Sequence, residues 1–283
     1  MGTLDLKDSN SEQVDIAHVF HCDGLLLCTT KDKKLVVWNP CLGETRWIQS
    51  KTGYTSYSTF SLGYQNNKSC RSYKILRCWD HHGYSQKVRF EIYEFTSDTW
   101  RRLDQTALEY FVIFLKGVSL KGNTFWIATG GGKKDDVLSF DFTTEKFKRW
   151  SLPAFQNDNR ITTGLSVVRD ENLLVLNLCF ITQQLDIWVT KKFDDTQAAL
   201  AWSKYFTVDL LKSKRNMWSV VATAVIYQEK KVVLCCSDGR RMSMDMVGED
   251  DVCFTEICYE EIKYGNEVRW PFIFNYVPSL VHI

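Results

Sequence analysis

The chain has 283 residues, of which 45% are hydrophobic, 24% charged and 14% aromatic, and ten are tryptophan. The 35 basic and 34 acidic residues give a net charge of +1, so composition offers no electrostatic reason to expect a nucleic acid or a membrane surface as partner. The polar start, MGTLDLKDSNSEQVD, lacks the features of a signal peptide, and no apolar run of about 20 residues occurs, so we expect a location in the cytoplasm or nucleus.

Short apolar runs recur along the chain, and turn residues separate them. Such runs, joined by Gly, Asn, Asp or Lys turns, are typical of β-hairpins. The sequence predicts five hairpins, in chain order Gly24–Cys28 with Leu35–Trp38, Tyr73–Cys78 with Val88–Phe95, Thr124–Ala128 with Val137–Phe142, Leu173–Phe180 with Leu185–Thr190, and Lys231–Cys235 with Arg241–Met246.

The second strand of each hairpin carries a large apolar residue, followed by a turn and then a further apolar or aromatic position. The five anchors are Trp38, Tyr93, Phe140, Trp188 and Met244. They recur about every 50 residues, which is the length of one four-stranded propeller blade. We therefore predict an all-β, β-propeller-like fold; a β-sandwich with similar strand spacing is the alternative.

The predicted domain occupies residues 18–283, and residues 1–17 are expected to be disordered or loosely attached. The end of the chain, RWPFIFNYVPSLVHI, is apolar and aromatic, so it is expected to pack on the domain as a last strand. Most of the ten cysteines lie in apolar runs such as VVLCC, and none shows C-x-x-C spacing, so they are expected to be small buried hydrophobes.

Seven segments in the same order resemble the F-box-associated (type 1, kelch-related) domain of plant F-box proteins. They are HCDGLLLCTT, LVVWNPCLGETRWI, SLKGNTFWIA, LSFDFTTEKF, LDIWVTKKF with AWSKYFTVDL, KKVVLCCSDG and FNYVPSLV, and they run from about His21 to Val281. The resemblance implies a protein-binding domain that holds the target of an SCF-type E3 ubiquitin ligase.

In that family an N-terminal F-box docks on a Skp1-type adaptor. Only residues 1–17 precede the domain predicted here, and they carry no L-P-x-x-L-type helical opening. We therefore expect adaptor binding only if an F-box is supplied upstream.

Several polar groupings contain residue types that could form a chemical site, but a structural role is the favoured interpretation for each. His18, His21 and Cys22 lead into a predicted strand, where residues three apart point to opposite faces, so a shared metal is not expected. Solvated loops or turns are expected for the others, which are His81-His82, the carboxylate pairs Asp135-Asp136, Asp194-Asp195 and Glu260-Glu261, the acidic run Glu249–Asp251, and the Gly130–Lys134 run. The sequence predicts no catalytic, cofactor-binding or metal site, and no enzyme.

Loop aromatics are the first choice for contact with a protein target, because aromatic residues dominate interface hot spots. The candidates are Tyr54, Tyr57 and Tyr84. Two alternatives remain open: a sugar-binding or glycoside-processing propeller, which needs convergent carboxylates in a central pocket, and a truncated product without function.

Overall fold

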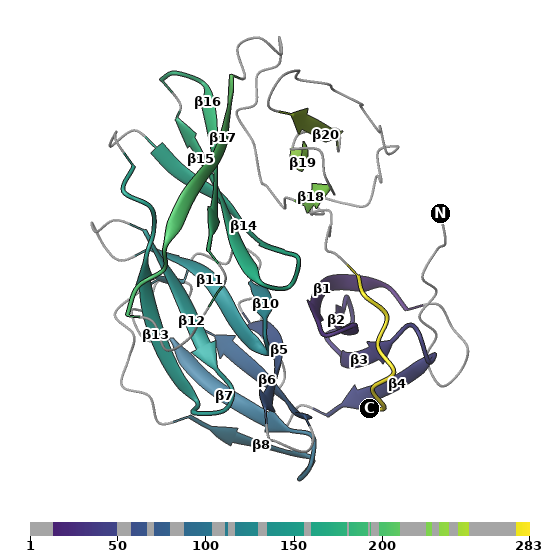
Figure 1. Ribbon diagram of the computed structural model, residues 1–283. Helices are drawn as coiled ribbons and strands as arrows, with labels where there is room; N and C mark the ends of the chain where they lie inside the picture. Colours follow the sequence, from purple (N-terminus) through teal and green to yellow (C-terminus); the bar gives the residue numbers. More distant parts are fainter. Residues whose placement is uncertain are drawn as a thin grey trace. The chain divides into compact units, whose positions relative to one another are not determined.

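The computed structural model describes residues 14–49, 58–66, 71–79, 88–103, 111–112, 117–129, 135–155, 160–179, 181–191, 193, 198–209, 225–227, 232–237, 243–248 and 276–283. Over these ranges the secondary structure is entirely β, without a helix (Figure 1). Accordingly, the described part has no helix that is long and apolar enough to cross a membrane.

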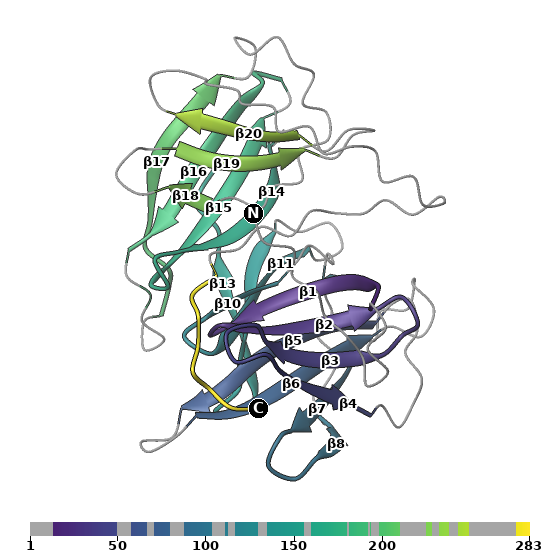
Figure 2. The same cartoon turned by 90° about the vertical axis from the view of Figure 1, so that its right-hand side faces the viewer.

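The strands form five sheets, and each sheet takes consecutive strands of the chain (Figures 1 and 2). The first sheet contains β1 (Ile16–Cys22), β2 (Leu25–Thr30), β3 (Leu35–Asn39) and β4 (Glu44–Ile48), and the second β5 (Ser58–Asn66), β6 (Arg71–Trp79), β7 (Arg89–Glu94) and β8 (Thr99–Arg102). The third contains β10 (Val118–Leu120), β11 (Asn123–Thr129), β12 (Asp136–Asp141) and β13 (Lys146–Ser151), with β9 (Phe111–Val112) paired to β11. The fourth contains β14 (Arg160–Val168), β15 (Asn172–Cys179), β16 (Gln184–Thr190) and β17 (Trp202–Asp209), and the fifth β18 (Val225–Tyr227), β19 (Val232–Ser237) and β20 (Ser243–Gly248).

All five predicted hairpins are confirmed. In the four complete sheets they are the two middle strands, and every anchor lies on the third strand of its sheet, except Met244, which lies on the last of the three described strands of the fifth sheet. Tyr93 and Phe140 are almost fully buried, and Trp38 is 7% exposed. The recurrent sequence pattern around each anchor therefore corresponds to the third strand, the turn that follows it and the start of the fourth strand.

The turns between third and fourth strands repeat one backbone feature. Gly43, Asp98 and Glu145 each stand immediately before the fourth strand with φ of 70°, 54° and 55°. Two of these turns are also capped by a side chain, since Asn39 Oδ1 accepts hydrogen bonds from the next backbone N–H groups and Asp141 Oδ1 does the same. Polar Asx caps and left-handed residues make these tight turns, so they fix the hairpin register.

The chain divides into two compact units. Unit 1 comprises Met1–Thr124, Phe140–Phe147 and Tyr276–Ile283, and unit 2 comprises Phe125–Ser139 and Lys148–Asn275. Within unit 1, β1 contacts both β5 and β10, so the first strands of three successive sheets lie side by side. Within unit 2, the first strands β14 and β18 are likewise in contact.

Each unit has an aromatic and aliphatic core of its own. In unit 1 the cluster includes Leu25, Leu62, Ile75 and Tyr93, all at most 1% exposed. In unit 2 the ring of Phe193 packs edge-on against Phe125 and Trp150, at centroid distances of 5.1 and 5.6 Å. Stacked sheets bury one another's faces in this way, which is how a single small sheet avoids exposing its apolar side.

The described end of the chain, Tyr276–Ile283, packs on the first sheet, where it appears in yellow in Figure 1. Asn39 Nδ2 donates hydrogen bonds to the carbonyl oxygens of Ser279 and Val281, at 3.0 and 2.8 Å. The expectation of a last strand is wrong for these eight residues, because they make no strand ladder. Side chains of the first sheet therefore supply hydrogen bonds that hold the segment.

Candidate protein-contact surface

One end of the second sheet brings together the strand ends that flank two loop segments. Ser58, at the start of β5, lies opposite Trp79, at the end of β6, and Trp79 lies opposite Arg89, at the start of β7. The segment before β5 and the segment between β6 and β7 therefore leave the sheet at the same end. We call the three residues Ser58, Trp79 and Arg89 the rim of the second sheet.

The predicted contact residues belong to the segments that this rim flanks. Tyr54 and Tyr57 precede Ser58, and Tyr84 stands between Trp79 and Arg89. All three tyrosines lie outside the described residues, so their role as contacts stays a prediction. The pairing register of β5, β6 and β7 shows that the strand ends that flank the two tyrosine-bearing segments are neighbours.

A buried ion pair supports this rim from within the sheet. The Arg77 side chain is 3% exposed, and its Nη1 lies 3.3 Å from Glu91 Oε2 on the neighbouring strand. Its Nη2 also donates to Ser58 Oγ at 3.2 Å, and the guanidinium lies 4.5 Å from the ring centroid of Trp79. A buried guanidinium needs such partners, since an unpaired buried charge costs several kcal/mol. Arg77 therefore fixes two of the three rim residues.

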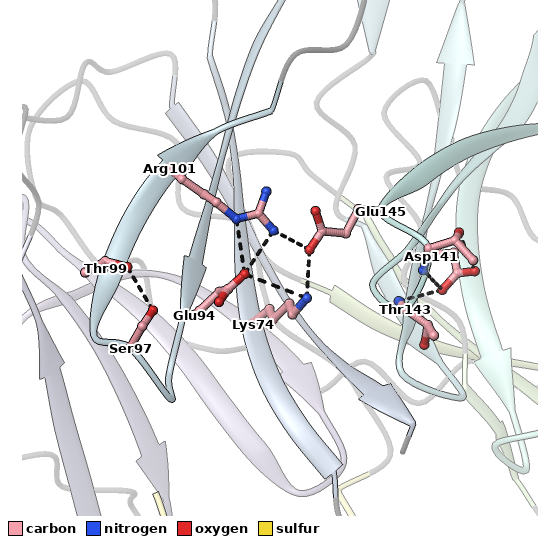
Figure 3. A network of polar contacts seen from close by, with 9 residues as sticks. Lys74, Glu94, Ser97, Thr99, Arg101, Asp141, Thr143 and Glu145 are labelled. Atoms are coloured by element: carbon pink, nitrogen blue, oxygen red, sulfur yellow. Dashed lines mark hydrogen bonds and ion pairs between the residues drawn. The ribbon is translucent and has the colours of Figure 1, made fainter. Parts of the chain in front are cut away.

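The opposite end of the same sheet carries a second charge network, which Figure 3 shows. Lys74, which is 7% exposed, places Nζ 2.7 Å from Glu145 and 3.9 Å from Glu94. Arg101 donates to Glu94 at 2.9 Å and also pairs with Glu145. Two cations and two carboxylates thus alternate, and Glu145 from the turn before β13 is joined to strands β6 and β8.

Electrostatics in this network favour the ionised form of Glu145. Partial burial alone would raise the pKa of that carboxyl, but hydrogen bonds from Arg101 and Lys74 outweigh it and hold the pKa below its usual range. The pKa of Arg101 is raised by its hydrogen bond to Glu145. Both shifts favour the charged forms of Glu145 and Arg101, so this pair acts as an ionic joint between strands rather than as a proton donor.

A similar joint links the first sheet to the second. Arg46, on β4, donates to the carbonyl oxygen of Phe95 at 3.0 Å and to Asp98 at 3.4 Å. Asp98 also accepts a hydrogen bond from Tyr93. Burial, followed by this bond, raises the pKa of Tyr93 to about 12. In both joints a fourth-strand arginine reaches the left-handed acidic residue of the next turn, a regularity that the sequence did not reveal.

The remaining chemical candidates that lie within the described residues do not come together. His21 accepts a hydrogen bond from the Gly24 N–H at 3.2 Å, while Cys22 is buried, accepts from Ser119 Oγ and has its pKa raised to about 12 by burial. Over the described ranges, no three His, Cys, Asp or Glu residues are grouped as a metal would require. Of the acidic pairs only Asp135-Asp136 is described; burial raises the pKa of Asp135, and Asp136 pairs with Arg149.

The other groupings lie outside the described residues. They are His81-His82, Gly130–Lys134, Asp194-Asp195, Glu249–Asp251 and Glu260-Glu261. Lys74 and Arg77 were not singled out from the sequence, because each sits in an apolar run, KILRC, that reads as core.

Consecutive sheets with the same strand order, whose first strands meet within each unit (β1 with β5 and β10, and β14 with β18), are typical of a repeat protein of the β-propeller class. The family model of the F-box associated beta propeller domain matches residues 2–283. The chain therefore belongs to this family, and the resemblance inferred from the seven segments is confirmed. The predicted β-propeller fold is confirmed as well, in preference to the alternative of a β-sandwich.

Relatives from Arabidopsis thaliana are similar over nearly the whole chain. F-box only protein 9 is 47% identical over 287 residues, which cover 99% of this chain and 74% of the relative. F-box/kelch-repeat protein At3g17530 is 38% identical, with 98% of this chain and 74% of the relative covered.

Solved structures are similar only remotely. Saccharomyces cerevisiae Sqt1 matches with a TM-score of 0.44 at 12% identity, over 92% of this chain and 68% of Sqt1. The Cps50 (Swd1) beta-propeller domain matches with a TM-score of 0.39 at 10% identity, over 86% of this chain and 88% of that domain. The family assignment rests on the sequence matches alone.

Proposed function

We propose that this chain is the target-binding part of an F-box-type substrate receptor and that it has no enzymatic activity. The observation that carries the proposal is its membership of the F-box associated family, together with relatives named as F-box proteins, 74% of whose length the chain matches. An SCF-type ubiquitin ligase in the cytoplasm or nucleus is the assembly in which such a receptor would work.

The rim of the second sheet is the contact surface that we favour. Ser58, Trp79 and Arg89 are neighbours, and Arg77 ties two of them to a buried ion pair. Loops that leave a rigid sheet can vary in sequence without loss of the core, so binding residues commonly lie there. Tyr54, Tyr57 and Tyr84 would then present aromatic side chains from two segments to one target.

A crosslinking pull-down from plant extract tests this surface. The wild-type chain and a variant with Tyr54, Tyr57 and Tyr84 changed to Ala are used as baits, and captured proteins are quantified by mass spectrometry. The matched control is Tyr205→Ala, a half-buried tyrosine on β17. A set of proteins captured by the wild type and the control but at least tenfold less by the triple variant supports the surface. Equal capture by all three would refute it.

Adaptor binding is tested separately. We expect the bare chain to capture its targets without a Skp1-type adaptor, and the chain with an F-box fused upstream to capture both. Capture of the adaptor by the bare chain would show that docking does not need an added F-box. Failure of the fused chain to capture adaptor and targets together would contradict the receptor role.

A further inference from the structure

Residues 276–283 meet the first sheet as a bound peptide would, and we call this segment the strap. Its residues alternate along an extended stretch: Ser279, Val281 and Ile283 are half-buried, whereas Pro278, Leu280 and His282 are exposed. Leu280 is 78% exposed. A period of two is that of an extended chain with one face on a surface.

The sheet supplies groups that recognise this backbone from one side. Asn39 is fully buried and its amide group is used completely, with Oδ1 capping its own turn and Nδ2 donating to the carbonyl oxygens of Ser279 and Val281. Glu44 Oε2 accepts from the backbone N–H of Ile283 at 3.2 Å. These contacts bind alternate backbone groups of the strap, and Glu44 Oε1 also hydrogen-bonds Nδ1 of the His282 side chain at 2.6 Å.

Apolar contacts and close fit complete the site. Val281 and Ile283 pack against the unit 1 core cluster. Gly24 lies beneath the strap, where a Cβ atom would stand 2.6 Å from the Val277 carbonyl oxygen and 2.5 Å from Ser279 Cβ. The ring of His21 lies 5.9 Å from that of Tyr276. The surface is therefore shaped for an extended backbone with aliphatic side chains two residues apart.

The strap is held more weakly than the strands beneath it. The strands β1 to β4 share ladders of backbone hydrogen bonds, with one irregularity between Ile16 and His18, whereas the described residues of the strap form no strand ladder with them. Segments with few buried contacts and no ladder open locally at a lower free energy than the sheet core unfolds. Opening leaves the ladders of the first sheet intact and exposes Asn39 to water, which can satisfy its amide.

We infer that the strap opens as a unit and uncovers on the first sheet a binding site for an extended peptide with aliphatic side chains at alternate positions. In the closed state the strap occupies that site in cis. The ligand that the site fits is a peptide with the strap's own sequence. This site is separate from the rim and does not depend on the receptor role.

Peptide binding to the full-length chain tests the inference. The probe is a fluorescent peptide, YVPSLVHI. The receptor is the chain with Val281→Asp and Ile283→Asp, whose charges we expect to expel the strap from the apolar cluster while the ladders of the sheet remain. We expect the released chain to bind the probe at least tenfold more tightly than the wild type. A peptide carrying the same two substitutions is the matched control and should not bind.

A substitution in the site separates recognition from general exposure of apolar surface. Asn39→Asp keeps the oxygen that caps the turn and removes both N–H donors, so in the released chain it should weaken probe binding at least tenfold. Unchanged affinity in this variant, or no binding to a folded released chain, overturns the inference.

Hydrogen exchange on the wild type provides a test that needs no variant, so it decides the matter if the released chain does not fold. The hydrogen-bonded amides of the strap, Val281 to Ser279 Oγ and Ile283 to Glu44, should exchange at least tenfold faster than the amides of β2 and β3. Exchange of all these amides together, only on global unfolding, would show that the strap does not open by itself.

Discussion

The two glycines at the turns of the first sheet allow the strap's contribution to stability to be isolated. Gly24 and Gly43 both have positive φ, 75° and 70°, so alanine is strained at either position. A Cβ at Gly43 would meet nothing within 4 Å, whereas one at Gly24 would meet backbone atoms of Val277 and Ser279 at 2.6 and 2.9 Å. Gly43→Ala therefore measures backbone strain alone, and Gly24→Ala adds displacement of the strap.

The expected magnitudes differ by enough to measure. A left-handed alanine costs about 1–2 kcal/mol, partly offset by about 0.4–1 kcal/mol from the stiffer unfolded chain, so Gly43→Ala should destabilise by about 1 kcal/mol. In Gly24→Ala the two hydrogen bonds from Asn39 are lost as well, at about 1 kcal/mol each. Reduced burial of Val281 and Ile283 contributes roughly 1 kcal/mol more, so Gly24→Ala should cost about 4 kcal/mol.

Urea unfolding followed by circular dichroism measures the two losses side by side. The midpoint of Gly24→Ala should lie well below that of Gly43→Ala, which should lie slightly below the wild type. Limited proteolysis should also cut the Gly24→Ala chain near its C-terminal end while it is still folded. Equal midpoints for the two variants would refute the reasoning, because they would show that strap contacts add nothing to the strain.

Three further changes test the joints and the core. Glu145→Gln should lower the free energy of unfolding at pH 7 by about 1–2 kcal/mol, after discounting for solvent screening, since a nearly buried lysine loses its nearest carboxylate. Folding lowers the pKa of Glu145, so its contribution to stability is present above the unfolded-state pKa of about 4.3 and is lost as the pH falls below that value. The urea midpoints of the wild type and the variant should therefore differ at pH 7 and converge by pH 3. A constant difference between the midpoints would contradict the pairing. Trp100→Phe should cost about 1 kcal/mol in the same assay, because Nε1 donates to the Gln49 carbonyl oxygen at 2.9 Å, and no loss would mean that water replaces that bond. Gly63→Ala should destabilise by roughly 3 kcal/mol or more, measured as the thermal midpoint, since its Cβ would stand 2.2 Å from the buried ring of Phe142, and a neutral result would show that the ring can move aside.

The middle strands of every sheet could be predicted from the sequence because their residues are apolar on both faces. Leu25–Thr30 and Leu35–Asn39 are nearly all buried, and this leaves unbroken apolar runs between polar turns. The first strands of the sheets are harder to predict from the sequence. In β5 (Ser58–Asn66), for example, polar residues and Gly63 give a composition that is typical of a loop. Its strand character comes from pairing along its whole length with β6, which is tertiary information.

Charged residues of the core were harder still to foresee. Lys74 and Arg77 are buried only because carboxylates from other strands, and for Lys74 from another sheet's turn, reach them. Nothing in the local sequence signals such a partner. The strap was expected as a strand from its apolar composition, but its described part is held by side chains of Asn39 and Glu44, whose role depends on the folded turn.

The two arginine joints give the row of sheets in unit 1 a direction. Arg46 on the first sheet reaches Asp98 of the second, and Arg101 on the second reaches Glu145 of the third. In both ion pairs the arginine lies on the earlier repeat and the carboxylate lies on the later one. The second repeat carries both groups, Asp98 for the arginine before it and Arg101 for the carboxylate after it, so an extra copy of this whole repeat inserted by gene duplication would form the same ion pairs without any charge change in its neighbours.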